Sequence, residues 1–279
     1  MSTHLSTRRT LLQAATVSAA GLVGLTAKAA DPLLFAINEG VTYQNNPLET
    51  QERYQPILDE LSKALKVPVK AVVVAKYDEL QKGLADHRFA LAYVHPAHYA
   101  IRALNGGYRL AALTKGFTEY RASFFVANNS PAKAVAELKG ARIGAPDEDS
   151  ITSVLMRATL RDAGIASDAR ITYVRYQDAV PFMVEHGMAS VGVSASKSVL
   201  KQWQDNGGKV IASSKPVPIK QLIVSGKAPA GTLERVSEYF LGLDQAKDGK
   251  ARLDAMRVTG FTPFDEEPLR AIGRWLTAG

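Results

Sequence analysis

The sequence predicts an α/β protein made of two lobes. From Leu33 onward, short apolar runs typical of buried strands alternate with segments of helical periodicity, which is the pattern of parallel sheets joined by crossover helices. Two such units follow one another without a linker rich in Pro, Gly or Ser. Because 46% of the 279 residues are hydrophobic, both units can bury a core. We therefore expect each lobe to hold a mostly parallel sheet flanked by helices, with a ligand cleft between the lobes.

The first unit contains four predicted strands, at residues 33–37, 67–75, 89–94 and 110–113. A helix between the first two strands is indicated by the i, i+3, i+4, i+7 spacing of Tyr54, Ile57, Leu58, Leu61 and Leu65. A second helix at 77–85 places Leu80 and Leu84 inward, and Pro96 favours a helix start after the third strand.

The second unit contains predicted strands at residues 122–127, 141–145, 171–174 and 189–193, and its pattern closes near Ile211. Its helices are expected at 131–138, from about Ser150, and at 179–185. An apolar run at 222–224 and helices at 233–241 and 267–276 follow. We expect the chain to cross twice between the lobes, so that residues 30–117 and 216–279 form the first lobe and residues 118–215 the second.

The amino terminus, residues 1–29, is predicted to be a cleavable signal peptide. Arg8 and Arg9 precede a mildly apolar run that ends at Leu25, as in twin-arginine export signals, and Ala27-Lys28-Ala29 has the small-x-small pattern of a cleavage site. The run falls short of the roughly 20 apolar residues of a membrane-spanning helix. Its removal lowers the formal net charge from +7 to +4, because this leader carries three basic residues and no carboxylate. We expect a periplasmic protein.

Composition argues against several other classes of protein. The chain has no cysteine, so neither a lipid-modified cysteine, a disulfide nor a thiolate site for a soft metal can form. The Lys and Arg residues are spread along the chain, without the basic run typical of nucleic-acid binding. There is no Gly-x-Ser-x-Gly, phosphate-loop or His-Glu-x-x-His motif. We expect no enzyme and no cofactor; an exported enzyme is the weaker alternative.

Four segments are distinctive in their order and spacing. They are Tyr54 to Leu65, Lys76-Tyr77-Asp78, Ala92 to Tyr99, and Glu137 to Ile143 followed by Asp147, Ser150, Thr152 and Ser153. Together they resemble the periplasmic phosphonate-binding proteins and their relatives for phosphite and phosphate. The resemblance implies the type II periplasmic-binding fold and a solute-binding protein that closes on its ligand.

The resemblance also implies a binding site. In the family, a Ser/Thr-rich loop opens a helix and grips an oxyanion, which suits the unpaired N–H groups and positive dipole at a helix start. A serine there can equally be a plain helix cap. Tyr77 and Tyr93 match aromatic positions that close on the ligand, and His95 stands where the family has glycine. The predicted ligand-binding residues are Tyr77, Tyr93, His95, Ser150, Thr152, Ser153 and Gln177.

Three departures from the family leave the ligand open. Gln177 replaces a histidine, Ala189-Ser190 replaces an aspartate, and residues 216–220 lack an expected acidic residue. Three carboxylates at residues 147–149 crowd the anion-binding helix and would repel an anion. Five cations near the predicted cleft edges can compensate: Lys76, Lys115, Arg121, Arg175 and Lys220. An oxyanion, a zwitterion and a neutral polar molecule therefore remain alternatives.

The expected function is capture of a small polar solute, of phosphate or phosphonate type, for delivery to a membrane ABC permease. A sensor kinase is an alternative membrane partner, and a monomer is expected. His95 and His98 are spaced to face one side of a helix, so a metal-binding module with a third donor such as His87 is a weaker alternative.

Overall fold

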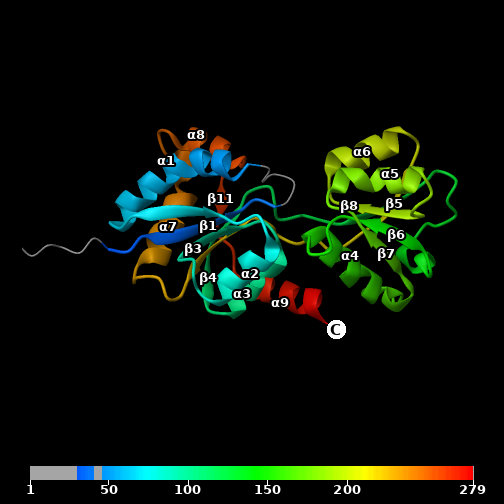
Figure 1. Ribbon diagram of the computed structural model, residues 1–279, viewed down its shortest axis with the longest axis horizontal. Helices are drawn as coiled ribbons and strands as arrows, with labels where there is room; N and C mark the ends of the chain where they lie inside the picture. The colour runs from blue at the N-terminus through cyan, green and yellow to red at the C-terminus, as the bar shows by residue number, and fades with distance from the viewer. Residues whose placement is uncertain (1–29, 41–45, 279) are drawn as a thin grey trace, which may run out of the picture. The chain divides into compact units, whose positions relative to one another are not determined.

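The computed structural model describes residues 30–40 and 46–278, which contain two β-sheets with helices on both faces of each (Figure 1). The predicted signal peptide lies outside the described residues. Within the described part of the chain, no helix is long and apolar enough to cross a bilayer.

The first sheet has six strands in the order β11-β4-β10-β3-β1-β2. β1 pairs in parallel with β2 and β3, whereas β10 runs antiparallel to β3 and β4. The sheet is thus mixed rather than mostly parallel. The reason is that β10 begins beside the end of β3, with Gln221 opposite Val94, and must run back along it. The strands are β1 (Leu33–Asn38), β2 (Val69–Val73), β3 (Leu91–Val94), β4 (Tyr108–Thr114), β10 (Gln221–Ser225) and β11 (Phe261–Thr262).

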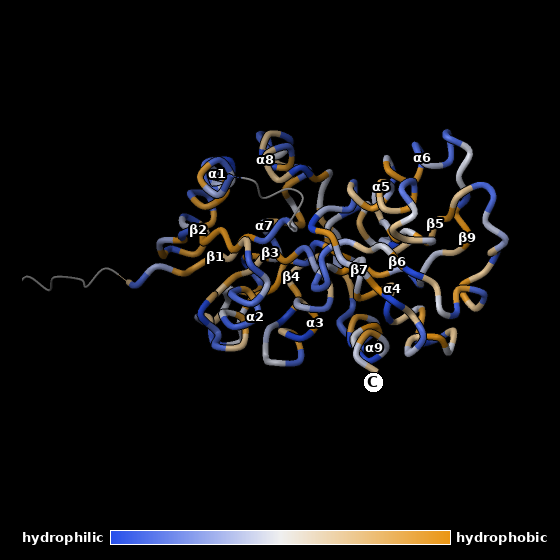
Figure 2. The backbone as a smooth tube through the Cα atoms, turned by 45° about the vertical axis from the view of Figure 1, so that its right-hand side comes forward, coloured by the Kyte–Doolittle hydropathy of each residue, from blue (hydrophilic) through white to orange (hydrophobic). Residues whose placement is uncertain are grey.

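Helices cover both faces of this sheet, and strand alternation decides what each face buries. Phe35 and Ile37 of β1 pack into one core with Tyr54 of α1, whereas Ala36 faces the other core with Tyr99 of α3. Figure 2 shows the strands as mostly apolar between helices of mixed polarity. The helices are α1 (Pro47–Leu65), α7 (Thr232–Leu241) and α8 (Gly249–Met256) on the first face, and α2 (Tyr77–Ala85), α3 (Ala97–Asn105) and α9 (Glu266–Thr277) on the second.

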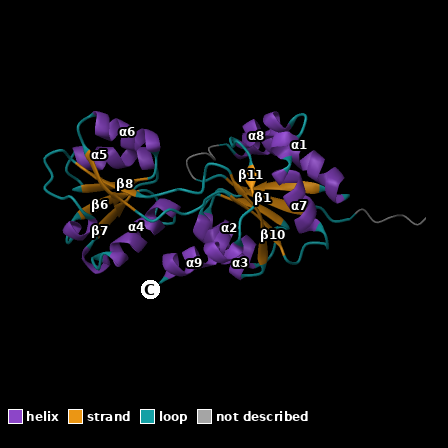
Figure 3. Cartoon of the chain, turned by 180° about the vertical axis from the view of Figure 1, so that it is seen from behind, coloured by secondary structure: helices purple, strands orange, loops and turns teal. Residues whose placement is uncertain are grey.

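The second sheet has five strands in the order β7-β6-β8-β5-β9 and is also mixed. β6 is parallel to β7 and β8, and β5 is antiparallel to β8 and β9. Phe124 packs in the core on the side of α4, and its neighbour Phe125 packs in another core with α5 and with Trp203 of α6. Figure 3 shows α4 on one face of this sheet and α5 and α6 on the other. The elements are β5 (Ser123–Val126), β6 (Arg142–Ala145), β7 (Arg170–Tyr173), β8 (Val191–Ser194), β9 (Lys209–Ser213), α4 (Ile151–Asp162), α5 (Val180–Glu185) and α6 (Lys197–Asp205).

Two crossing segments, residues 115–122 and 214–220, join the sheets. They run side by side, because Tyr120 and Val217 exchange both backbone hydrogen bonds and Ile219 donates its N–H to the carbonyl of Phe117 at 2.9 Å. The chain therefore leaves the first sheet after β4 and returns to it at β10.

Most predicted elements are confirmed, but the helix predicted at 131–138 is wrong. Only a 3-10 turn forms there, because Ala134 is extended and Gly140 takes a left-handed conformation soon after. α6 and α8 were not predicted; α8 buries Leu253 and Met256 but its apolar residues do not gather on one face. The short 3-10 helices are η1 (Val135–Leu138), η2 (Ala166–Asp168), η3 (Gln177–Ala179) and η4 (Leu243–Gln245).

Candidate functional site

A cavity of about 790 Å³ is lined by residues of both sheets' elements and of both crossing segments. This volume is within the range of about 300 to 1,000 Å³ typical of small-molecule sites. The contributions are Tyr77 and His95 from the first sheet's side, Phe117, Tyr120 and Lys220 from the crossing segments, and Ser150, Thr152 and Gln177 from the second sheet's side.

The first turn of α4 opens into this cavity. Ser150 is its N-cap, and its hydroxyl oxygen accepts a hydrogen bond from the N–H of Ser153 at 3.2 Å. The hydroxyl of Ser153 points back and donates to the carbonyl of Pro146 at 2.8 Å. The N–H groups of Ile151 and Thr152 belong to the first turn, where helix geometry supplies no acceptor. This helix start thus offers backbone donors and a positive dipole end to the cavity.

A hydroxyl and amide network covers the side chain of Thr152. The hydroxyls of Thr152 and Tyr120 are 2.7 Å apart, and Gln177 donates to the Tyr120 hydroxyl at 3.4 Å. The amide oxygen of Gln177 accepts from the hydroxyl of Ser194 at 3.0 Å and from the N–H of Ala195 at 2.6 Å. The position of Gln177 is thereby fixed by the end of β8.

Five of the seven predicted ligand-binding residues line the cavity: Tyr77, His95, Ser150, Thr152 and Gln177. Tyr93 and Ser153 do not. The ring of Tyr93 packs in the core against Tyr54 and Phe261, and its hydroxyl is 3.3 Å from that of Thr114. Burial raises the pKa of Tyr93 well above its ordinary range.

His95 lies in the cavity wall as a neutral imidazole. Its ring meets the ring of Tyr120 edge-on, with centroids 6.1 Å apart, and packs against Gly40 so closely that a Cβ there would be 3.0 Å from the imidazole. Burial lowers the pKa of His95 to about 3, and the charge of Lys220 contributes. His95 can therefore offer a neutral donor and acceptor, but not a positive charge, at neutral pH.

His98 does not line the cavity. Its ring packs on Tyr99 at a centroid distance of 4.1 Å, and burial lowers its pKa to about 3. Among the described residues, no group of three or more His, Asp or Glu side chains is arranged to hold a metal ion.

Charges of both signs face the cavity. The cations are Arg121, Arg175, Lys197 and Lys220, and the carboxylates are Glu119, Asp147 and Asp178. Arg121 donates a hydrogen bond to Glu119 at 3.1 Å, so the positive charge of Arg121 and the negative charge of Glu119 neutralise each other. Two cations that the sequence placed near the cleft lie elsewhere: Lys76 is near Glu79 on the surface and Lys115 pairs with Asp244 at 2.6 Å.

The comparison with known families decides the class of this site. Residues 40–269 match the family described as ABC transporter, phosphonate, periplasmic substrate-binding protein. The chain belongs to this family. It is thus a periplasmic substrate-binding protein of the ABC-transporter type, and the family is a transport component rather than a group of enzymes.

Solved structures with the same fold cover nearly the whole binding protein. A Xanthomonas citri protein bound to ATP has a TM-score of 0.75 at 15% identity, covering 89% of this chain and 98% of that one. PhnD1 from Prochlorococcus marinus in complex with methylphosphonate has a TM-score of 0.65 at 19% identity, covering 88% and 97%. The aliphatic sulphonate binding protein SsuA from Escherichia coli has a TM-score of 0.54 at 14% identity, covering 88% and 90%. These neighbours are type II periplasmic binding proteins, and that is the fold of this binding protein.

Two aromatic residues that line the cavity of the binding protein, Phe117 and Tyr120, were not among the residues predicted from the sequence. Both lie on the first crossing segment, which joins the sheets beside the cavity. Their position could have indicated them, because both are aromatic residues at the point where the chain passes from the first predicted unit to the second.

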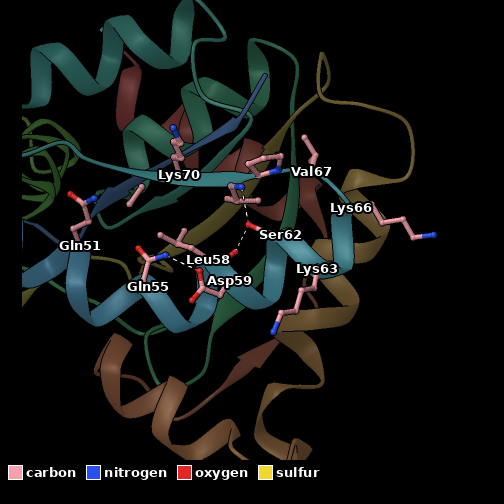
Figure 4. A pocket seen from close by; sticks show the side chains of 12 residues that line it. Gln51, Gln55, Leu58, Asp59, Ser62, Lys63, Lys66, Val67 and Lys70 are labelled. Atoms are coloured by element: carbon pink, nitrogen blue, oxygen red, sulfur yellow. Dashed lines mark hydrogen bonds between the residues drawn. The ribbon is translucent and has the colours of Figure 1, made fainter. Parts of the chain in front are cut away.

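A second hollow, of about 940 Å³, lies between α1 and β2 of the binding protein (Figure 4). Its lysines, Lys63, Lys66 and Lys70, point away from one another, so no polar groups converge on one point. The hydroxyl of Ser62 bonds to the carbonyl of Leu58 and the N–H of Val69, which is a structural role. No predicted site residue lines this groove.

Proposed function

We propose that this binding protein captures a small oxyanion of the phosphate or phosphonate type and delivers it to a membrane ABC permease. The observation that carries the proposal is that the start of α4 and the cationic residues Arg175 and Lys220 line one cavity. Ser150 and Thr152 lie on the helix side and Lys220 on the crossing segment. Helix starts bind phosphate, sulfate and carboxylate groups through this combination of N–H donors and dipole.

Capture is proposed to proceed by hinge closure. Residues 30–117 with 216–279 would move as one lobe and residues 118–215 as the other, about the paired crossing segments. Closure on a ligand requires contacts that exist only when both lobes meet it. His95 and Tyr77 are positioned to supply them from one side, and Ser150 and Gln177 from the other. The protein is proposed to act as a monomer after export.

The family and the neighbours support an oxyanion over other solutes. The family is described as phosphonate-binding, and PhnD1 and SsuA are described with methylphosphonate and aliphatic sulphonate. The charges that line the cavity also favour an anion slightly, because the pairing of Arg121 with Glu119 leaves three cations, Arg175, Lys197 and Lys220, against the carboxylates of Asp147 and Asp178.

A thermal-shift screen tests the proposed function. The purified protein would be heated with phosphate, phosphite, methylphosphonate, methanesulfonate, small neutral solutes and divalent metals. A ligand that binds only the folded state stabilises it by about 2.7 kcal/mol at a hundredfold excess over Kd. The proposal predicts a rise in Tm with one or more oxyanions. A rise with a metal or a neutral solute alone would contradict it.

A further inference from the structure

The last helix of the chain, α9, is fixed to the helices of the first sheet. Leu269, in its first turn, is fully buried. Gly273 approaches α3 so closely that a Cβ there would lie 2.5 Å from the side chain of Ile101. Arg270 donates a hydrogen bond to the side chain of Asn105, the last residue of α3, at 2.6 Å. These contacts make α9 a rigid part of the proposed first lobe.

The last turn of α9 reaches the end of α4, which belongs to the second sheet's side (Figure 1). The indole N–H of Trp275 donates to the carboxylate of Asp162 at 2.9 Å. The guanidinium of Arg161 donates to the backbone carbonyls of Trp275 and Ala278, the latter at 2.6 Å. Leu276 is buried in the same apolar core as residues of α4. Polar and apolar contacts thus join one helix of each proposed lobe.

The second crossing segment takes part in the same contact through Lys215. Its ammonium donates to the carboxylate of Asp162 at 3.0 Å and lies 5.0 Å from the centre of the Trp275 ring. The hydrogen bonds from Lys215 and Trp275 lower the pKa of Asp162, so its carboxylate is charged at neutral pH. Asp162 is 38% exposed, and each contact alone is therefore weak. What distinguishes this carboxylate is that α4, α9 and the crossing segment all meet at it.

The contact acts on the cavity through α4. This helix follows Ser150, its N-cap in the cavity wall, and ends at Asp162. Its 12 residues extend over about 18 Å, so α9 touches α4 far from the cavity. A continuous hydrogen-bonded helix moves as one body, and holding its end therefore restricts its start. In the arrangement that the structure describes, the bond from Trp275 to Asp162 is present while residues of both proposed lobes line one cavity.

We propose that the end of α9 is a third connection between the lobes, beside the two crossing segments, and that it sets ligand affinity from outside the cavity. Trp275 and Asp162 are positioning residues: they hold α4 where its start meets the ligand together with the first lobe. The inference rests on the proposed function and goes beyond it. Without this contact the lobes also populate arrangements that cannot hold one ligand between them. The apparent Kd then rises in inverse proportion to the fraction of molecules that can bind.

Calorimetric titration with methylphosphonate tests this role in the wild type, in Trp275→Phe, in Asp162→Ala, in their double variant and in Arg274→Ala. Arg274 is the matched control, because it neighbours Trp275 but pairs with Glu267 within α9 at 2.9 Å. We expect Trp275→Phe and Asp162→Ala each to weaken binding by roughly three- to tenfold, the effect of one or two net hydrogen bonds. The double variant should match Asp162→Ala, because both substitutions remove the same bond. Arg274→Ala should match the wild type.

Small-angle X-ray scattering of the ligand-free proteins separates positioning from a loss of local folding. We expect a larger radius of gyration in Trp275→Phe and Asp162→Ala than in the wild type and Arg274→Ala. Weaker binding with an unchanged radius of gyration would overturn the proposal. Unchanged or tighter binding in both variants would also overturn it, while the wild type's binding leaves the proposed function intact. A wild type that binds no oxyanion would contradict the proposed function instead, and the radius of gyration then tests the third connection by itself: an unchanged value overturns it.

Discussion

The hydroxyl of Tyr120 lies 2.7 Å from the hydroxyl of Thr152 and links the first crossing segment to the first turn of α4. Thr152 is fully buried, so this contact is made inside the protein rather than on its surface. The proposed hinge and the proposed anion-binding helix are therefore joined by one hydrogen bond.

The energy of that bond can be measured by a double-mutant cycle. Tyr120→Phe and Thr152→Val each remove one hydroxyl and keep the side-chain shape. We expect the two substitutions to be non-additive by about 0.5–1.5 kcal/mol in the free energy of unfolding, the net value of a typical hydrogen bond. Urea denaturation of the wild type, both single variants and the double variant gives this coupling. Strict additivity would show that the bond does not form in solution.

Ser150 is expected to have two separable roles. As the N-cap of α4, its replacement by alanine should lower the free energy of unfolding by about 1 kcal/mol. Its place in the cavity predicts that anion affinity falls as well. Asn46, the N-cap of α1, bonds to the N–H of Leu48 at 3.1 Å and does not line the cavity, so Asn46→Ala is the matched control. We expect Asn46→Ala to lose a similar amount of stability and to keep the anion affinity of the wild type. Equal anion affinity in the Ser150→Ala and Asn46→Ala variants would mean that Ser150 only caps the helix.

Two half-buried histidines, His95 and His98, predict how stability depends on pH. Burial lowers the pKa of His95 and of His98 from 6.5 to about 3, so both stay neutral in the native state while the unfolded chain takes up protons below about pH 6.5. The unfolded state then binds more protons, and stability must fall as the pH falls. We expect the urea midpoint to decrease between pH 7 and pH 5. Replacing both histidines by glutamine should flatten this decrease; an unchanged slope would contradict the assignment of both imidazoles as neutral in the native state.

Glu39, which follows β1, and Arg53 of α1 form a largely buried ion pair. Glu39 is 3% exposed, is 2.7 Å from Arg53, and accepts a hydrogen bond from the hydroxyl of Tyr54 at 2.9 Å. Arg53→Met leaves a buried carboxylate without its hydrogen-bonded cation and should lower the free energy of unfolding by about 3–5 kcal/mol. Adding Glu39→Gln should recover part of this loss in urea denaturation. A loss below about 1 kcal/mol would mean that the pair is hydrated.

The sequence was sufficient for elements whose residues carry a clear period. Tyr54 to Leu65 show one apolar helix face and lie in α1, and Ser150 was expected at a helix start and is the cap of α4. The direction of each strand could not be predicted from the sequence, because the alternation of apolar residues is the same in parallel and antiparallel strands. The antiparallel course of β5 and β10 follows from where the chain crosses between the sheets.

The same limit applies to the candidate site. Tyr93 lies on β3 between Ala92 and Val94, which face the other core, and only the assembled sheet shows that its ring packs on α1 rather than in the cavity. Lys220 was one of five cations near the predicted cleft edges, and its burial and left-handed backbone depend on contacts with His95 and Thr114 that are remote in sequence.

The central claim is that the start of α4 binds an oxyanion inside the cavity. Calorimetric titration of methylphosphonate into the wild type and into the Ser150→Ala, Thr152→Val double variant tests it most directly. We predict saturable binding at one site in the wild type and an affinity at least tenfold lower in the double variant. Equal affinity in the two proteins, or no binding of methylphosphonate, phosphate or methanesulfonate to the wild type, would contradict the claim.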